Sequence, residues 1–84
     1  MYRVFLERAA ERDLRRLPAR LHNRIISALQ ALADEPRPSG CRKLSGSDRD
    51  WRIRVGDYRI VYEVDDATLE VRVNRVRHRR EVYR

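Results

Sequence analysis

The sequence predicts one α+β domain over residues 1–84, and its hydrophobic pattern changes period halfway along the chain. Apolar residues recur at helical spacing in the first half, whereas they alternate with charged residues in the second half. Pairs of turn-forming residues interrupt the alternating half. We therefore expect an N-terminal strand, a two-helix antiparallel hairpin and then a mostly antiparallel sheet.

The first half begins with a short strand, expected at residues 2–6, after which the apolar spacing becomes helical. Pro18 ends the first helix, because its ring clashes with the preceding turn of a helix. The second helix is expected at residues 19–34, and Pro36 and Pro38 lie beyond its end. The apolar positions expected to face the core are Leu6, Ala10, Leu14, Leu17, Leu21, Ile25, Ala28, Leu29 and Leu32.

The second half predicts strands with two tight turns, at Gly56-Asp57 and at Asp65-Asp66. The expected strands are residues 43–45, 51–55, 58–64 and 69–76. A two-residue first turn sets Ile53 opposite Ile60, and directly opposed residues share a face. The face expected to pack on the helices carries Trp51, Ile53, Val55, Tyr58, Ile60, Tyr62, Leu69, Val71 and Val73.

The same register places arginines together on the other face of the sheet. Arg54 lies opposite Arg59, with Arg52 and Arg72 on the same side, next to Glu70 and Asn74. Opposed like charges destabilise a sheet by tenths of a kcal/mol, so folding does not require them. Two interpretations remain open: a solvated face, or a preassembled surface whose guanidinium groups bind phosphate. The carboxylates available to neutralise this face are Asp50, Glu63 and Glu70.

The composition gives a strongly basic chain, with 20 Lys and Arg against 13 Asp and Glu, a net charge of +7 and a pI of about 10.7. This charge favours a polyanionic partner, either nucleic acid or an acidic protein segment. A single cysteine, Cys41, excludes an internal disulfide and fits a reducing compartment. With no apolar run of membrane-spanning length and no signal-peptide core, we expect a cytoplasmic protein with no membrane contact.

The C-terminal segment, residues 72–84, carries six arginines and one acid, Glu81. It leaves the last strand, and we expect it to fold back beside the arginine face. His78 is either a surface residue or the one group there whose ordinary pKa lies near neutrality. Tyr83 either stacks on a nucleobase or caps the sheet edge. Neither His22 nor His78 has metal-ligand spacing, and there is no Gly-rich phosphate loop, so we expect no metal and no cofactor.

Four segments together resemble the RelE/ParE superfamily of toxins from toxin-antitoxin modules. They are DLRRLP at residues 13–18, KLSG at 43–46, WRIRVGDYRIVYEVDD at 51–66 and HRREVY at 78–83. The resemblance covers nearly the whole chain and implies the RelE-like fold. Its RelE branch implies a ribosome-dependent endoribonuclease that cuts mRNA in the ribosomal A site, inhibits translation and is neutralised by a cognate antitoxin in a hetero-oligomer.

The resemblance also implies roles for individual residues. Phosphate binding and transition-state stabilisation fall to Arg52, Arg54 and Arg59, proton donation to Arg79 or its neighbour Arg77, and base stacking to Tyr83. The catalytic residues so implied are Arg52, Arg54, Arg59, Arg79 and Tyr83. The further RNA-binding residues that we expect are Lys43, Arg72, Arg77, His78 and Arg80.

The chain departs from the well-studied RelE enzymes, which resemble it but carry lysines at the positions of Arg52 and Arg54. A guanidinium, with a pKa above about 12, is a poor general base, so catalysis would rely on electrostatics and positioning, with His78 as a candidate proton acceptor. Two alternatives stay open. One is a ParE-like inhibitor of DNA gyrase, and the other is a catalytically degenerate toxin that acts only as an antitoxin-bound co-repressor.

Overall fold

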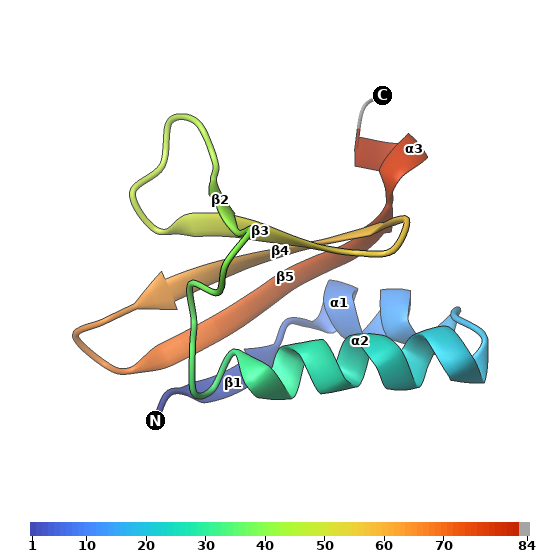
Figure 1. Cartoon of the computed structure of the whole chain (residues 1–84), viewed down its shortest axis with the longest axis horizontal. Coiled ribbons are helices and arrows are strands. Elements are labelled where there is room, and N and C mark those ends of the chain that lie inside the picture. Colours follow the sequence, from blue (N-terminus) through green and yellow to red (C-terminus); the bar gives the residue numbers. More distant parts are fainter. Residues whose placement is uncertain (83–84) are drawn as a thin grey trace.

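The computed structural model describes the backbone of residues 1–82 and the side chains of residues 1–81, and within them a five-stranded sheet carries two helices on one face (Figure 1). The strand order is β1-β5-β4-β3-β2. β1 runs parallel to β5, and the other neighbours are antiparallel. The predicted fold class is therefore confirmed. The strands are β1 (Arg3–Leu6), β2 (Arg42–Lys43), β3 (Asp50–Val55), β4 (Tyr58–Asp65) and β5 (Glu70–His78).

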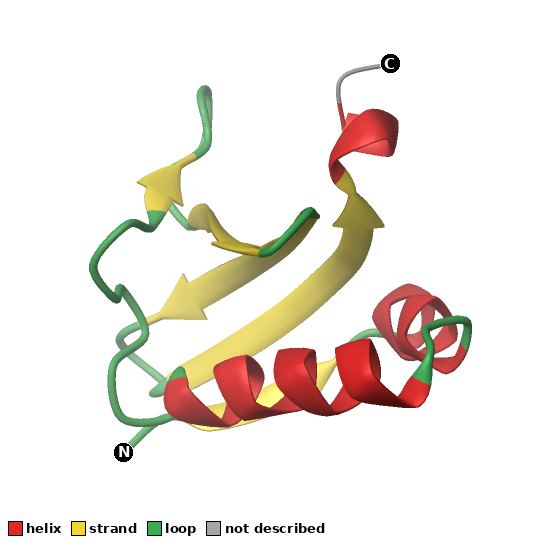
Figure 2. Ribbon diagram, turned by 45° about the vertical axis from the view of Figure 1, so that its right-hand side comes forward, coloured by secondary structure: helices red, strands yellow, loops and turns green. Residues whose placement is uncertain are grey.

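The two helices that cover the sheet are α1 (Arg8–Arg15) and α2 (Ala19–Ala31). α2 ends before residue 34, because residues 32–34 form turns. Figure 2 shows α1 nearly end-on while α2 runs across the view, so the helices meet at a steep angle instead of lying side by side. No helix of the described chain is long and apolar enough to cross a membrane.

The core lies between these helices and the sheet. It is formed by Ala10, Leu14, Ile25, Leu29, Leu32, Ile53, Ile60, Tyr62, Val64, Val71, Val73 and Val76. The predicted pairing of Ile53 with Ile60 is confirmed, and Trp51 opposes Tyr62. Tyr62 is completely buried, and its hydroxyl donates a hydrogen bond to the carbonyl of Pro36 at 2.8 Å. This burial raises the pKa of Tyr62 above its ordinary value.

Two local features of β4 and β5 differ from the sequence prediction. Leu69 is 46% exposed with a φ of 56°, so its expected place in the core is wrong. The turn is longer than Asp65-Asp66, because the Asp65 carboxylate accepts hydrogen bonds from the amides of Ala67 and Thr68. A β-bulge follows: Val61 opposes Arg75 while Tyr62 opposes Val73, which leaves Asn74 without a direct partner.

α1 is tied to β5 by a partly buried carboxylate. Asp13 accepts hydrogen bonds from Arg75 Nε at 2.8 Å and Nη2 at 3.1 Å, and from the amide of Val76 at 2.9 Å. Partial burial acts to raise the pKa of Asp13, but these hydrogen bonds and the charge of Arg75 outweigh it and hold that pKa below its ordinary value. The pair therefore fixes the bulged region of β5 against the first helix.

Candidate phosphate-binding site

Four arginines lie on the face of the sheet opposite the helices. Arg54 on β3 opposes Arg59 on β4, and Arg52 opposes Arg42 on β2. Because opposed residues share a face and alternate residues of a strand do too, all four project to the same side. The predicted grouping of Arg52, Arg54 and Arg59 is thus observed.

These side chains surround a depression of about 450 Å³, which we call the arginine hollow. Its lining consists of Gly40, Arg42, Arg52, Arg54 and Arg59. No carboxylate lines it, and none of the ion pairs between described residues involves these four arginines. The hollow is therefore a concentrated, uncompensated positive site, which is the chemistry that a phosphate requires.

Two of the guanidinium groups in the hollow differ in their hydrogen bonding. Arg54 Nε donates to the carbonyl of Gly56 at 3.1 Å, which fixes that group beside the β3–β4 turn. Arg59 Nη1 is buried and has no hydrogen-bond partner among the described residues. Buried polar groups in proteins are nearly always hydrogen-bonded. The Arg59 guanidinium therefore has a hydrogen-bond donor that no described residue uses.

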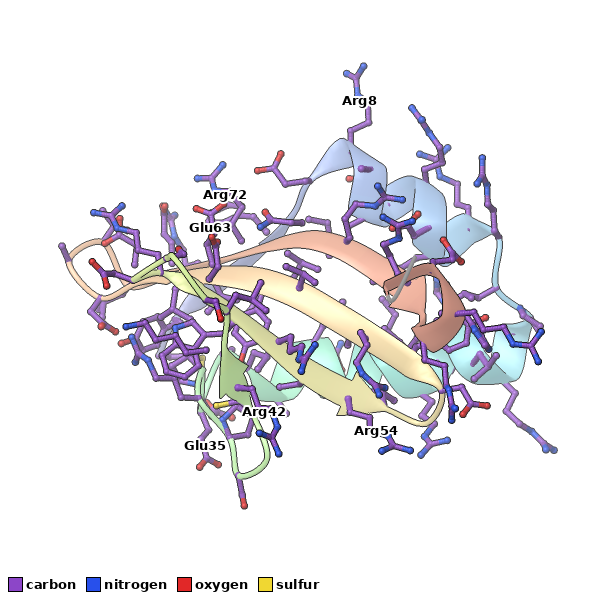
Figure 3. All side chains as sticks on the ribbon, turned by 90° about the horizontal axis from the view of Figure 1, so that it is seen from above. Arg8, Glu35, Arg42, Arg54, Glu63 and Arg72 are labelled. Atoms are coloured by element: carbon purple, nitrogen blue, oxygen red, sulfur yellow. The ribbon has the colours of Figure 1, made fainter. Side chains whose placement is uncertain are left out.

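The other end of the same sheet face is electrically neutral. Arg72 opposes Glu63 and lies 3.5 Å from the Glu7 carboxylate and 3.6 Å from that of Glu70. Its guanidinium is also 5.9 Å from the centre of the Phe5 ring. Figure 3 shows Arg72 beside Glu63 and apart from Arg42 and Arg54, which project from the opposite edge of the sheet. Arg72 therefore shares the sheet face of the other arginines, as predicted, but it lies outside the arginine hollow.

Lys43 also lies outside the arginine hollow. It opposes Trp51, so it shares the face that Trp51 packs toward the core. Its ammonium lies 3.4 Å from the carboxylate of Asp48. Nothing in this position brings Lys43 to the four arginines.

The arginines that follow in the sequence are divided between the end of β5 and a short helix, α3 (Arg79–Val82), which the pattern did not predict. Arg77 opposes Arg59, which extends the row of guanidinium groups onto a third strand, and its Nε lies 3.4 Å from Glu81. The amide of Arg79 donates to the carbonyl of Asp57 at 2.7 Å, so α3 starts against the β3–β4 turn. Tyr83, the expected stacking residue, lies outside the described residues.

A second depression, of about 430 Å³, lies under that turn, and we call it the turn hollow. Its lining consists of Leu21, Arg24, Arg54, Gly56, Asp57, Tyr58 and His78. The rings of Tyr58 and His78 meet edge to face, with centroids 5.3 Å apart and planes at 85°. His78 Nδ1 accepts the amide of Arg80 at 3.2 Å, which places the proton of the neutral ring on Nε2.

His78 therefore shares the core-facing side of the sheet with Tyr58 and does not lie beside the arginine hollow. Three lining residues were not predicted from the sequence. β2 begins at residue 42, one residue earlier than expected. With that start, strand alternation alone would have placed Arg42 on the arginine face. Gly40 lies in a loop and Arg24 on the exposed side of α2, and no sequence pattern links either to the sheet.

No three His, Cys, Asp or Glu side chains among those described lie close enough together to hold a metal ion.

Fold and site together define a small α+β protein with a positively charged hollow on an open sheet face. Residues 4–83 match the model of the family described as ParE toxin of type II toxin-antitoxin system, parDE. The chain therefore belongs to the ParE toxin family, within the RelE/ParE superfamily of type II toxins.

The individual relatives carry Rel names. The chain is 36% identical over 87 residues to toxin RelG of Mycobacterium tuberculosis, covering 99% of this chain and 97% of that protein. The RelE-RelB complex of Pyrococcus horikoshii is similar in structure with a TM-score of 0.84 and 28% identity, covering 93% of this chain and 94% of that one. The isolated RelE toxin of E. coli gives a TM-score of 0.81 and 28% identity, covering 99% and 92% of the two chains.

Proposed function

We propose that the protein is a toxin that cleaves mRNA on the ribosome and thereby inhibits translation. The observation that carries this proposal is the arginine hollow, which is lined by four guanidinium groups and no carboxylate. A phosphodiester would fill this site, since planar guanidinium groups bind phosphate oxygens through paired hydrogen bonds. The similarity to RelE and RelG toxins supports the same activity.

In the proposed reaction, the 2′-hydroxyl of the RNA attacks the neighbouring phosphorus, and the bond from phosphorus to the 5′-oxygen of the next nucleotide breaks. Negative charge builds on the phosphoryl oxygens during this attack. Arg52, Arg54 and Arg59 would stabilise that charge, because their positions are fixed by the sheet before substrate binds. Arg42 adds a fourth cation from β2.

The proposal assigns no proton transfer to the arginines of the hollow, because a guanidinium does not lose its proton in proteins. His78 is the histidine nearest to Arg59 in the sequence. Its side chain nevertheless lies in the turn hollow, on the helix side of the sheet. Arg54 lines both hollows. His78 would therefore accept the 2′-hydroxyl proton of a substrate that extends past Arg54, and water would protonate the leaving 5′-oxygen. Arg79, also a guanidinium, would contribute charge and not a proton.

The test is a cell-free translation reaction in which new mRNA 5′ ends are mapped after the toxin is added. The wild-type protein is expected to produce ends at codon-spaced positions. Arg59→Ala should reduce their yield by about 100-fold or more, the scale seen when one preorganised transition-state donor is removed. The matched control is Arg72→Ala, which removes an arginine from the same sheet face but from its neutral end, and should cleave within twofold of the wild type.

Intact transcripts with the wild-type protein would overturn the proposal, as would equal losses from Arg59→Ala and Arg72→Ala.

The family match to ParE toxins favours a second candidate, inhibition of DNA gyrase. In that case plasmid supercoiling by purified gyrase falls while RNA stays intact. A co-repressor without toxicity would instead leave growth normal when the protein is expressed without its antitoxin.

We further propose that the partner is an acidic antitoxin, which forms a hetero-oligomer with this chain. The net charge of +7 and the uncompensated arginine hollow favour an acidic, partly apolar segment. Related toxins have been crystallised as RelE-RelB complexes. Co-purification with the product of the neighbouring gene tests this pairing, and failure to co-purify would count against it.

A further inference from the structure

The turn hollow differs in chemistry from the arginine hollow. The arginine hollow is lined by guanidinium groups and one glycine, whereas the turn hollow also presents two aromatic rings and the aliphatic side chain of Leu21. Tyr58 and His78 form its aromatic wall, and they hold each other edge to face. Aromatic and aliphatic surfaces bind the flat faces of nucleobases and gain nothing from a bare phosphate. The two hollows are therefore suited to different parts of one nucleotide chain.

Arg54 joins the two hollows, because its side chain lines both. Its Nε is fixed by the carbonyl of Gly56, which leaves both terminal nitrogens free of described partners. Figure 3 shows this side chain projecting beyond the edge of β3. A strand of RNA whose phosphate lies in the arginine hollow would therefore pass Arg54 and reach the turn hollow around the sheet edge.

Arg24 places a second guanidinium in the turn hollow, from a different element. Its Nη1 lies 3.2 Å from the position that a Cβ on Gly56 would occupy, so the group packs directly against the backbone of that glycine. Gly56 has a φ of 60°, which glycine adopts most readily. Arg24 forms no ion pair with the described residues. A planar cation held this way offers a stacking face and hydrogen-bond donors.

Asp57 decides which part of a nucleotide the turn hollow would accept. It is the carboxylate in the lining, and Arg79 Nη1 lies 4.0 Å from it, at the limit of an ion pair. A phosphate beside Asp57 would be repelled by that carboxylate, and Arg24 and Arg54 in the same lining would offset part of this repulsion. An exocyclic amino group of adenine, guanine or cytosine would instead donate a hydrogen bond to the carboxylate. The lining thus favours a base over a phosphate.

We propose that the turn hollow is a nucleobase site, in which Arg24 contacts the base of the nucleotide that adjoins the phosphate held in the arginine hollow. This inference rests on the proposed function for its substrate class. It adds α2 to the RNA-binding surface through Arg24.

The experiment measures binding of a single-stranded RNA trinucleotide, with one 2′-deoxy sugar at the cleavage position to prevent cleavage, to the full chain by calorimetry. Arg24→Ala is expected to weaken binding about tenfold, within the range measured for loss of one base contact. The matched control is Arg20→Ala, one turn earlier on α2 and outside the lining of both hollows, which should change affinity by less than twofold. Thermal unfolding of each variant checks that the fold is retained.

A second ligand separates a base contact from a phosphate contact. For a trinucleotide backbone that lacks its bases, Arg24→Ala should bind as the wild type does, whereas Arg59→Ala should bind more weakly. Equal effects of Arg24→Ala on the two ligands would overturn the base assignment. So would equal effects of Arg24→Ala and Arg20→Ala, or a loss seen only with an antitoxin peptide.

The outcomes also distinguish this inference from the proposed function. If Arg59→Ala weakens RNA binding and Arg24→Ala does not, the nucleobase site is wrong and the phosphate site stands. If Arg24→Ala weakens binding and Arg59→Ala does not, the phosphate assignment fails.

Discussion

Guanidinium groups in this chain have distinct roles because their partners differ. Arg75 is held by two hydrogen bonds from its own side chain to Asp13, and Arg72 lies between two glutamates. These contacts join elements of the fold. Arg59, in contrast, has a buried nitrogen without an acceptor. Opposed arginines such as Arg54 and Arg59 reduce stability slightly, so folding does not account for their placement, which fits the proposed phosphate site.

The Asp13–Arg75 pair gives a prediction about stability and pH. Asp13→Asn should lower the free energy of unfolding by about 2 kcal/mol at pH 7, since it weakens charge-assisted hydrogen bonds to Arg75 and to the amide of Val76. The pKa of Asp13 is lower in the folded protein than in the unfolded chain. Its contribution is therefore complete above about pH 3.9, the unfolded value, and is lost as pH falls through the folded pKa.

Urea unfolding of the variant and the wild type, at pH 7 and again at the lowest pH at which both fold, measures this effect. The difference between them should shrink at the lower pH. Asp48→Asn is the control, because Asp48 pairs with Lys43 while 99% exposed and should change stability little at either pH. A loss that is the same at both pH values would contradict the role given to the Asp13 carboxylate.

The sequence predicted individual side-chain directions well where a strand follows strict alternation. The positions of Arg52, Arg54 and Arg59 follow from a two-residue turn and a period of two, and the observed register agrees. Arg24 could not be predicted in this way. Its role depends on how α2 approaches the β3–β4 turn, and no local pattern encodes that approach.

At the scale of elements, the bulge in β5 explains where sequence reasoning failed. Strict alternation from Val71 and Val73 would bury Arg75 and expose Val76. The unpaired residue Asn74 reverses the direction of the side chains that follow, so Val76 is buried and Arg75 reaches Asp13. A strand that contains a bulge has the same kinds of residues as a regular strand, so its composition does not reveal the inserted residue. The elements could therefore be predicted, but the bulge could not.

The long turn before β5 and the short helix α3 have a similar explanation. Asp65 accepts two backbone hydrogen bonds that extend the turn, and Leu69 closes it in a left-handed conformation that leucine rarely adopts. The start of α3 is set by an amide of Arg79 that bonds to the distant carbonyl of Asp57. Both features depend on contacts that the local sequence does not indicate.

Across the whole molecule, one sheet face carries two different electrostatic environments. Carboxylates of Glu7, Glu63 and Glu70 surround Arg72 at one end, whereas the arginine hollow at the other end has no described carboxylate in its lining. A net charge of +7 attracts a polyanion to the chain as a whole. We propose that the uneven distribution of carboxylates directs a phosphate to the arginine hollow.

NMR of the arginine Nε–H groups measures directly where RNA contacts this face. The toxin is titrated with a short single-stranded RNA that carries one 2′-deoxy sugar at the cleavage position. Signals of Arg42, Arg52 and Arg59 should shift with a common dissociation constant, while those of Arg72 and Arg75 stay in place. If Arg72 and Arg75 shift as much as Arg59, or if Arg59 does not respond while RNA binds, the arginine hollow is not the phosphate site.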